Sequence, residues 1–107
     1  MKTLVIMPTF NEAASLGSTV QVLMESAAKF DLLIVDDNSP DGTGLLADQI
    51  AAQSSSKNKG VFVLHRSNKD GLGAAYLEGF DWAFARDYEV VVEMDADGSH
   101  RAVDLPK

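Results

Sequence analysis

The sequence predicts one α/β domain in which helices cover a parallel sheet. Short β-branched runs alternate with segments whose apolar residues recur at helical spacing. The runs are apolar at consecutive positions, which is typical of strands buried on both faces. The chain has 107 residues, of which 46% are hydrophobic and 23% charged, as expected for a single ordinary globular domain.

The order of the elements follows from these patterns. Strands are expected at residues 3–7, 32–35, 61–64 and 90–94. Helices are expected between them, with apolar stripes made by Leu16, Val20, Leu23 and Ala27, by Leu45, Leu46 and Ile50, and by Leu72, Tyr76, Phe80, Ala83 and Phe84. This alternation predicts right-handed crossovers and a parallel sheet. The segments that follow the strands then meet at one edge, where open α/β sheets bind ligands.

Composition excludes several classes of protein. There is no cysteine, so disulfide frameworks, thiolate zinc sites and cysteine nucleophiles are excluded. A formal net charge of −7 argues against a nucleic-acid-binding surface. The apolar run before Pro8, about five residues, is too short for a signal peptide or a membrane span. A cytoplasmic location is expected, with any membrane contact peripheral.

Two carboxylates follow the last predicted strand, at Asp95 and Asp97. At a strand end, both can lean toward one hard cation whose remaining positions are taken by water and phosphate oxygens. A solvated acidic turn is the alternative, because three-letter motifs recur by chance. Their position after a buried strand, with Ser99 and His100 just beyond, favours the metal site of a nucleotide-sugar enzyme.

A second polar segment, residues 36–43, follows the second predicted strand. Its Asn-Ser-Pro-Asp-Gly sequence is typical of a turn, and Asp41 or Thr43 is expected to cap the next helix. Asp36 and Asp37 are adjacent carboxylates that repel each other. We therefore expect one of them to accept hydrogen bonds from a base or a ribose.

The segment after the first strand, residues 8–12, has two interpretations. In the structural one, Pro8 ends the strand, Asn11 caps the helix, and Glu12 interacts favourably with the helix dipole. In the functional one, Phe10 lies beside a nucleoside and Glu12 accepts hydrogen bonds from ribose hydroxyls.

The glycine-rich segment around Gly71 and Gly73 is only a weak dinucleotide fingerprint. Tyr76 occupies the last glycine position, and the segment follows the third strand rather than the first. A helix entrance packed against the sheet is the favoured interpretation. There is no Walker motif, and Arg66 is the better candidate on this edge for contacting an anionic ligand.

Together the four segments resemble the polyprenol (dolichol) phosphate mannose synthases of glycosyltransferase family 2. The resemblance spans nearly the whole chain and is carried by P-T-F-N-E at 8–12, V-D-D-N-S-P-D-G-T at 35–43, G-L-G-A-A-Y with G-F at 71–80, and M-D-A-D-G-S-H at 94–100. It implies a Rossmann-like parallel sheet with flanking helices, the N-terminal half of a GT-A fold. It also implies transfer of mannose, with inversion, from GDP-mannose to a polyprenyl phosphate at the cytoplasmic membrane face, using Mg²⁺ or Mn²⁺.

The resemblance assigns roles to individual residues. The guanosine pocket would be lined by Pro8, Phe10, Glu12, Val35 and Asp37. The diphosphate and metal would be met by Asp95, Ala96 and Asp97, with Ser99 near the metal and the two aspartates as the catalytic groups. Two positions depart from the family pattern: Phe10 stands where a tyrosine is common, and Gly98 where a bulky apolar residue is usual.

Length and charge complete the expectations. Residues 1–107 would be the nucleotide-sugar-binding part of a GT-A domain, ending soon after the D-x-D segment. The net charge of −7 would partly reflect a cation site, since six acids fall on one edge: Glu12, Asp36, Asp37, Asp41, Asp95 and Asp97.

Three alternatives stay open. The first is a non-catalytic nucleotide-binding or self-associating module, with exposed sheet edges favouring homo-oligomers. The second is a family 2 transferase with another nucleotide-sugar donor, because GDP and UDP enzymes share D-x-D chemistry. The third, a flavodoxin-like receiver, is weaker, because here the acidic pair follows the second predicted strand and not the first.

Overall fold

The computed structural model describes residues 2–26, 28–54, 59–67, 72–94 and 100–101. The elements are β1 (Thr3–Thr9), α1 (Ala13–Glu25), β2 (Asp31–Asp36), α2 (Thr43–Ser54), β3 (Val61–His65), α3 (Leu72–Phe84), β4 (Val90–Met94) and β5 (His100–Arg101). The predicted α/β order is confirmed, and the four predicted strands agree with the observed ones to within two residues at each end.

The sheet has the strand order β3-β2-β1-β4-β5. β1 pairs in parallel with both β2 and β4, β2 pairs in parallel with β3, and β5 is antiparallel to β4. The chain moves outward from β1 to β3 and then returns to the other side of β1. The strand order therefore reverses between β1 and β4, and in open α/β sheets a ligand-binding crevice forms at the carboxyl ends of the strands at such a point.

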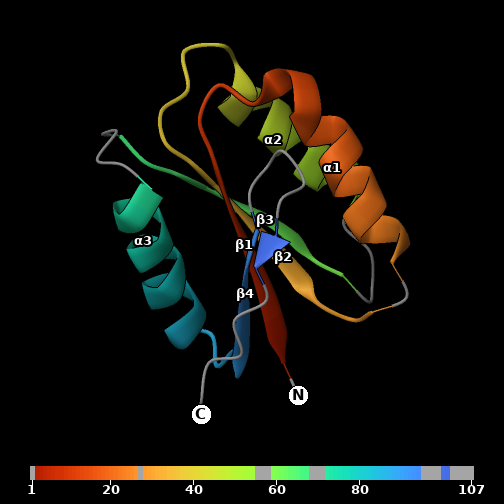
Figure 1. Ribbon diagram of the computed structural model, residues 1–107, viewed down its shortest axis with the longest axis vertical. Coiled ribbons are helices and arrows are strands. Elements are labelled where there is room, and N and C mark those ends of the chain that lie inside the picture. The colour runs from red at the N-terminus through yellow and green to blue at the C-terminus, as the bar shows by residue number, and fades with distance from the viewer. Residues whose placement is uncertain (1, 27, 55–58, 68–71, 95–99, 102–107) are drawn as a thin grey trace.

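Helices α1 and α2 cover one face of the sheet and α3 covers the other (Figure 1). Each face has its own core. On the α1 and α2 side the buried residues are Val5, Met7, Leu16, Val20, Leu32, Ile34, Ala47 and Val61. On the α3 side they are Leu4, Ile6, Leu33, Val35, Ala75, Ala83 and Val91. Consecutive residues of β1 and β2 thus enter different cores, which explains their unbroken apolar runs.

The expectation of burial on both faces is wrong for β3. This strand lies at the edge of the sheet, and Phe62 remains 40% exposed. Helix α3 packs over β1, β2 and β4, so one helix leaves the side chains of β3 partly open on its face.

Pro8 does not end its strand, because β1 continues through Thr9 and Pro8 pairs with Val35. The register of β1 with β4 extends only to Ile6 and Glu93. Beyond Ile6 the described pairing of β1 is with β2 alone. A proline is tolerated there because a missing N–H costs little where one side of the ladder is open.

The glycine that packs against the sheet is Gly79, not Gly73. A Cβ atom at Gly79 would lie 2.8 Å from Cγ2 and 2.9 Å from Cδ1 of Ile6, whereas a Cβ at Gly73 would meet no atom within 4 Å. The favoured interpretation of the glycine-rich helix entrance is therefore wrong for Gly73, and Gly71 lies outside the described residues. Gly79 allows the middle of α3 to approach β1 closely.

A buried lysine holds the end of α1. The Nζ of Lys59 donates to the carbonyl oxygens of Leu23 at 3.0 Å and Met24 at 3.2 Å, and also to that of Ser26. These carbonyls belong to or follow the last turn of the helix, where no intrahelical donor is available. Lys59 thus closes α1 from a segment that the sequence presents as a plain loop.

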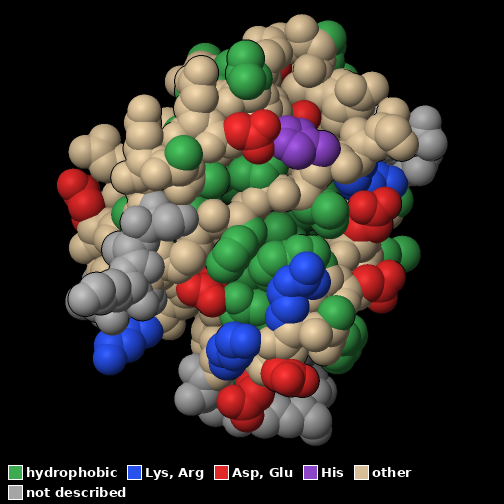
Figure 2. Space-filling model, turned by 180° about the vertical axis from the view of Figure 1, so that it is seen from behind, with side chains coloured by type: hydrophobic (Ala, Val, Ile, Leu, Met, Phe, Trp, Pro, Cys, Tyr) green, Lys and Arg blue, Asp and Glu red, His purple; other side chains and the backbone are tan. Residues whose placement is uncertain are grey.

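Aromatic side chains gather at the edge of the sheet where the strands begin. Figure 2 shows hydrophobic side chains beside lysine and arginine side chains on the side of the protein turned away in Figure 1. The rings of Phe62 and Trp82 lie 5.2 Å apart and those of Trp82 and Tyr88 6.0 Å apart. The Tyr88 hydroxyl donates to Asp31 Oδ2 at 2.5 Å, and burial together with this carboxylate raises the pKa of Tyr88.

The aromatic cluster lines a pocket of about 550 Å³, with the guanidinium of Arg86 4.0 Å above the Trp82 ring. These contacts tie the end of α3 to the strand starts. None of the helices within the described ranges has the length and apolar character needed to cross a membrane.

Candidate functional site

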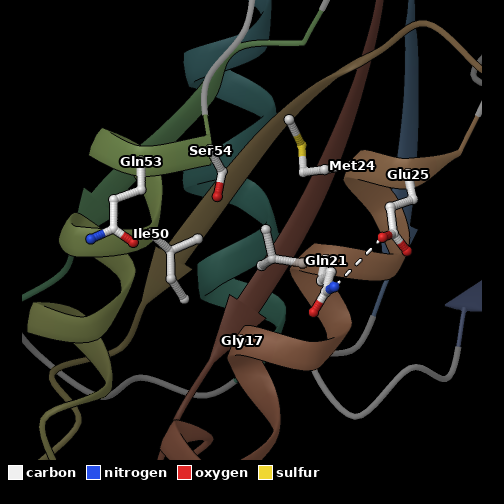
Figure 3. A pocket seen from close by; sticks show the side chains of 8 residues that line it. Gly17, Gln21, Met24, Glu25, Ile50, Gln53 and Ser54 are labelled. Carbon is white, nitrogen blue, oxygen red and sulfur yellow. Dashed lines mark hydrogen bonds between the residues drawn. The ribbon is translucent and has the colours of Figure 1, made fainter.

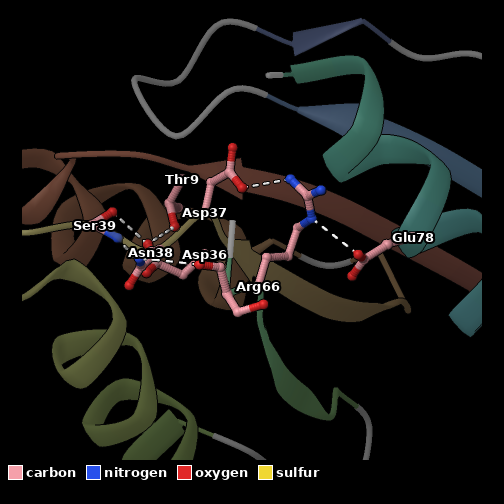
Figure 4. A network of polar contacts seen from close by, with 8 residues as sticks. Thr9, Asp36, Asp37, Asn38, Ser39, Arg66 and Glu78 are labelled. Carbon is pink, nitrogen blue, oxygen red and sulfur yellow. Dashed lines mark hydrogen bonds and ion pairs between the residues drawn. The ribbon is translucent and has the colours of Figure 1, made fainter. Parts of the chain in front are cut away.

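The polar segments that follow β1, β2 and β3 meet at one edge of the sheet, which we call the carboxyl edge. The Asn11 amide donates to Ser39 Oγ at 3.0 Å, joining the segments after β1 and β2. Asn38 Nδ2 donates to the Ser67 carbonyl at 3.3 Å, joining the segments after β2 and β3. The prediction that these segments come together is confirmed (Figure 4).

The N-terminus of α1 is capped by the neighbouring loop. The prediction of an Asn11 cap is wrong: the N-cap position is Glu12, which makes no side-chain cap bond, and Asn11 adopts a left-handed conformation with φ of 54°. The Glu12 amide donates to Thr43 Oγ1 at 3.0 Å, and the Ala13 amide to Asp41 Oδ2 at 3.3 Å. Residues distant in sequence supply the acceptors that the helix needs.

Asp41 serves two helices at once. Its Oδ1 accepts hydrogen bonds from the amide of Thr43 at 3.0 Å and from the Thr43 hydroxyl, while its Oδ2 accepts from the first amide of α1. The expectation that Asp41 caps α2 is confirmed. These hydrogen bonds, that of the Thr43 side chain foremost, lower the pKa of Asp41. The loop thus fixes the starts of α1 and α2 relative to each other.

Asp36 is a buried anchor for the same loop. Its Oδ1 accepts from Thr9 Oγ1 at 2.7 Å and from Ser39 Oγ at 2.6 Å, and its Oδ2 accepts from the Ser39 amide at 3.1 Å. A Cβ at Gly44 would lie 2.9 Å from Asp36 Oδ2, so glycine is needed for this close approach of α2. The protein itself therefore supplies donors to both oxygens of Asp36.

Asp37 lies on the other face of the sheet, because successive side chains of an extended strand alternate. Its Oδ1 accepts from Arg66 Nη1 at 2.5 Å, and both side chains are buried. Arg66 Nε lies 3.2 Å from Oε1 of Glu78, whose side chain is about half exposed on α3. In Figure 4 one oxygen of Asp37 turns toward Arg66 and the other away from it.

The remaining predicted nucleotide residues occupy two environments. Pro8 and Val35 are register partners in β1 and β2, and both are buried. Val35 has no exposed surface, so its part in the guanosine pocket stays a prediction. Phe10 and Glu12 are half-buried at the carboxyl edge, where they were expected.

The expected metal and diphosphate residues, Asp95, Ala96, Asp97 and Ser99, lie outside the described residues. Within the described ranges, no group of three or more histidine, aspartate or glutamate side chains is placed to hold a metal ion.

Sequence reasoning missed Glu78 and Thr9. Glu78 interrupts the apolar stripe of α3, which is the one signal that could have drawn attention to it. Thr9 gave no signal because its hydroxyl matters only through its contact with Asp36, far away in the sequence.

A pocket of about 390 Å³ between α1 and α2 lies away from this site (Figure 3). It is lined by the second halves of both helices, with residues including Gln21, Glu25 and Gln53. Both helices begin at the carboxyl edge, so this pocket lies toward the opposite edge of the sheet.

Comparison with known proteins decides the family. Residues 4–107 match the model of "Glycosyl transferase family 2". The chain belongs to glycosyltransferase family 2. Two relatives are similar over its whole length: the "Undecaprenyl-phosphate mannosyltransferase" of Micrococcus luteus, 52% identical over 107 residues, and the "Polyprenol monophosphomannose synthase" of Mycolicibacterium smegmatis, 50% identical over 106 residues. The chain spans 42% and 39% of their lengths and corresponds to their N-terminal part.

Solved structures confirm the expected GT-A fold of this family 2 chain. The mannosyltransferase PcManGT of Pyrobaculum calidifontis, solved with GDP-Man and Mn²⁺, aligns over 90% of this chain and 27% of its own with a TM-score of 0.76 and 23% identity. TarS of S. aureus, in a structure of residues 1–349, aligns over 91% of this chain and 28% of its own with a TM-score of 0.75 and 23% identity. The chain has the fold of the N-terminal part of a GT-A glycosyltransferase.

Proposed function

We propose that this chain is the nucleotide-sugar-binding part of an inverting mannosyltransferase that transfers mannose from GDP-mannose to a polyprenyl phosphate. The observation that carries the proposal is its identity of 52% and 50%, over 107 and 106 residues, to relatives named for mannose transfer to undecaprenyl phosphate and for polyprenol monophosphomannose synthesis.

The nucleoside is proposed to bind at the carboxyl edge. Phe10 would lie beside the guanine ring, Glu12 would accept hydrogen bonds from ribose hydroxyls, and Asp37 would accept from the base. Support comes from the half-buried positions of Phe10 and Glu12 and from the Asp37 oxygen that faces away from Arg66. Pro8 and Val35 would form the floor of this pocket, beneath these side chains.

The diphosphate is proposed to be neutralised by Mg²⁺ or Mn²⁺ held by Asp95 and Asp97, with Ser99 near the metal and Ala96 against the diphosphate. A bound divalent cation would supply charge neutralisation for the leaving diphosphate. The acceptor phosphate is already anionic, so it needs no general base to attack the sugar carbon. A single displacement of this kind inverts that carbon, and the protein contributes positioning and electrostatic stabilisation.

Two alternatives are specific enough to test. TarS, which shares the fold, has been solved in complex with UDP, so a UDP-sugar is the competing donor. The chain spans about two fifths of the length of its curated relatives, so nucleotide binding without transfer is the competing activity, with self-association through sheet edges as its extension. A cytoplasmic position at the membrane surface stays a prediction.

Calorimetry with GDP-mannose tests the binding step. We expect binding in Mn²⁺ or Mg²⁺, loss of binding in a chelator, and loss in the double variant Asp95→Asn with Asp97→Asn. A matched control, Asp81→Asn with Asp87→Asn, removes two exposed charges at the far end of α3 and is expected to bind normally. Equal binding with and without metal would refute the role assigned to Asp95 and Asp97.

Competition and transfer assays separate the alternatives. GDP is expected to displace GDP-mannose far better than UDP does, and the reverse order would identify a UDP-sugar donor. Transfer of labelled mannose to a polyprenyl phosphate in detergent would establish the catalytic proposal, whereas binding without transfer would support the nucleotide-binding module. Sizing the protein in solution decides whether that module self-associates.

A further inference from the structure

Arg66 is shared between two carboxylates that come from different elements. Its Nη1 donates to Asp37 Oδ1 at 2.5 Å at the end of β2, and its Nε lies 3.2 Å from Glu78 Oε1 in the middle of α3. The side chains of Arg66 and Asp37 are only 5% and 7% exposed, while that of Glu78 is 49% exposed. The buried pair is therefore held from outside by a third, half-exposed group.

This arrangement differs from the one that a lone arginine and carboxylate prefer. Such pairs are frequently bidentate, with two parallel N–H groups meeting both carboxylate oxygens. Here the contact joins one oxygen of Asp37 to one nitrogen, and Figure 4 shows the second oxygen turned away. Glu78 occupies the Nε edge of the guanidinium and so fixes its plane.

The second oxygen of Asp37 matters because an ionised carboxylate only accepts hydrogen bonds. Guanine carries ring and exocyclic N–H donors, and a carboxylate with an available oxygen can accept from them. If Arg66 turned to meet both oxygens, a base would have to compete with a buried, charge-assisted pair. Keeping Arg66 on one oxygen therefore favours nucleoside binding.

We propose that Glu78 is a positioning residue: by holding Arg66 at its Nε edge, it keeps one oxygen of Asp37 available to the nucleobase. This inference rests on the proposed function, since it assumes that Asp37 contacts the base. It adds a residue of α3 that does not itself touch the nucleotide, and it links the middle of that helix to base affinity.

The test compares two substitutions of Glu78 with a matched control. Glu78→Ala removes the contact to Arg66, and we expect it to weaken the binding of GDP with Mn²⁺ by about tenfold, the size of one charge-assisted hydrogen bond. Glu78→Gln keeps an oxygen that can accept from Nε and is expected to stay within about threefold of the wild type. Asp81→Ala removes an exposed carboxylate from the same helix and is expected to bind GDP normally.

Inorganic pyrophosphate with Mn²⁺ is the ligand that separates positioning from general damage. It lacks a base, so its affinity is expected to be equal in the wild type and in Glu78→Ala. Unchanged GDP affinity in Glu78→Ala, or an equal loss for GDP and pyrophosphate, would overturn the inference.

A crystal structure of Glu78→Ala gives an answer that does not depend on nucleotide binding. We expect Arg66 to meet both oxygens of Asp37 in this variant, and an Arg66 that stays on one oxygen would overturn the inference. If the wild-type chain fails to bind GDP, the proposed function is refuted, while the position of Arg66 still decides what Glu78 does.

Discussion

Replacing Gly79 with alanine tests the close packing of α3 on the sheet. The new Cβ would lie 2.8 Å from Cγ2 and 2.9 Å from Cδ1 of Ile6, distances at which something must shift. Ile6 is fully buried, and its Cγ2 is attached directly to a branched Cβ, so it cannot rotate away without moving the rest of the side chain. The added methyl group therefore forces the helix or the strand to move.

The expected size of the effect is a balance of two terms. Overpacking a buried site costs about 1–3 kcal/mol. Alanine is better than glycine in a helix by about 1 kcal/mol, which offsets part of that cost. We expect a net loss of about 1–2 kcal/mol in the free energy of unfolding. At an unfolding entropy of about 2.1 cal/mol/K per residue, this lowers the Tm of a chain of 107 residues by about 5–9 °C.

Thermal unfolding followed by circular dichroism measures this shift. Gly17→Ala is the matched control, because Gly17 lies within α1 and a Cβ there meets nothing within 4 Å. It is expected to raise the Tm by a few degrees through helix propensity alone. Adding Ile6→Val to Gly79→Ala removes the Cδ1 contact, so the two changes together should cost less than their sum. A Gly79→Ala variant as stable as Gly17→Ala would refute the packing argument.

Three further outcomes follow from buried or capping groups. The pKa of Asp41 is lowered from 3.8 on folding, so its contribution to stability is present above that pH and is lost as the pH falls through the lower folded value; the stability gap between wild type and Asp41→Asn in urea should close on acidification. Lys59→Met should cost about 1–3 kcal/mol, measured by urea unfolding, because buried carbonyls at the end of α1 lose their donor. Arg66→Met should cost about 3–5 kcal/mol by leaving Asp37 buried without its cation, and Asp37→Asn should restore part of the loss; an unchanged urea midpoint in either single variant would contradict its burial.

The sheet could be predicted because its signal is local. The runs at β1 and β2 are apolar at every position, since alternate side chains enter different cores. The same reasoning failed for β3, whose exposure depends on its place at the edge of the sheet, and strand order is not written in any single run. The two residues of β5 are too few to carry a pattern.

The site was only partly predictable, because residue type shows which groups can act but not which partners they meet. The sequence identified Asp36 and Asp37 as a costly pair, and their burial confirms that they needed partners. Strand alternation, however, places them on opposite faces, so each is stabilised separately and the repulsion between neighbours is relieved. The contact between Arg66 and Glu78 joins the end of a strand to the middle of a helix, which no local pattern specifies.

These contacts change the meaning of the negative charge at the carboxyl edge. Asp36 accepts three hydrogen bonds from Thr9 and Ser39, Asp41 serves the first amides of two helices, and Asp37 faces Arg66. The donors that hold these carboxylates belong to the chain itself, so within the described residues the acids that follow β2 stabilise the loops and do not form a cation site. The divalent cation of the proposed reaction must then depend on Asp95 and Asp97, and the acids after β2 contribute by fixing the loops against which the nucleoside would bind.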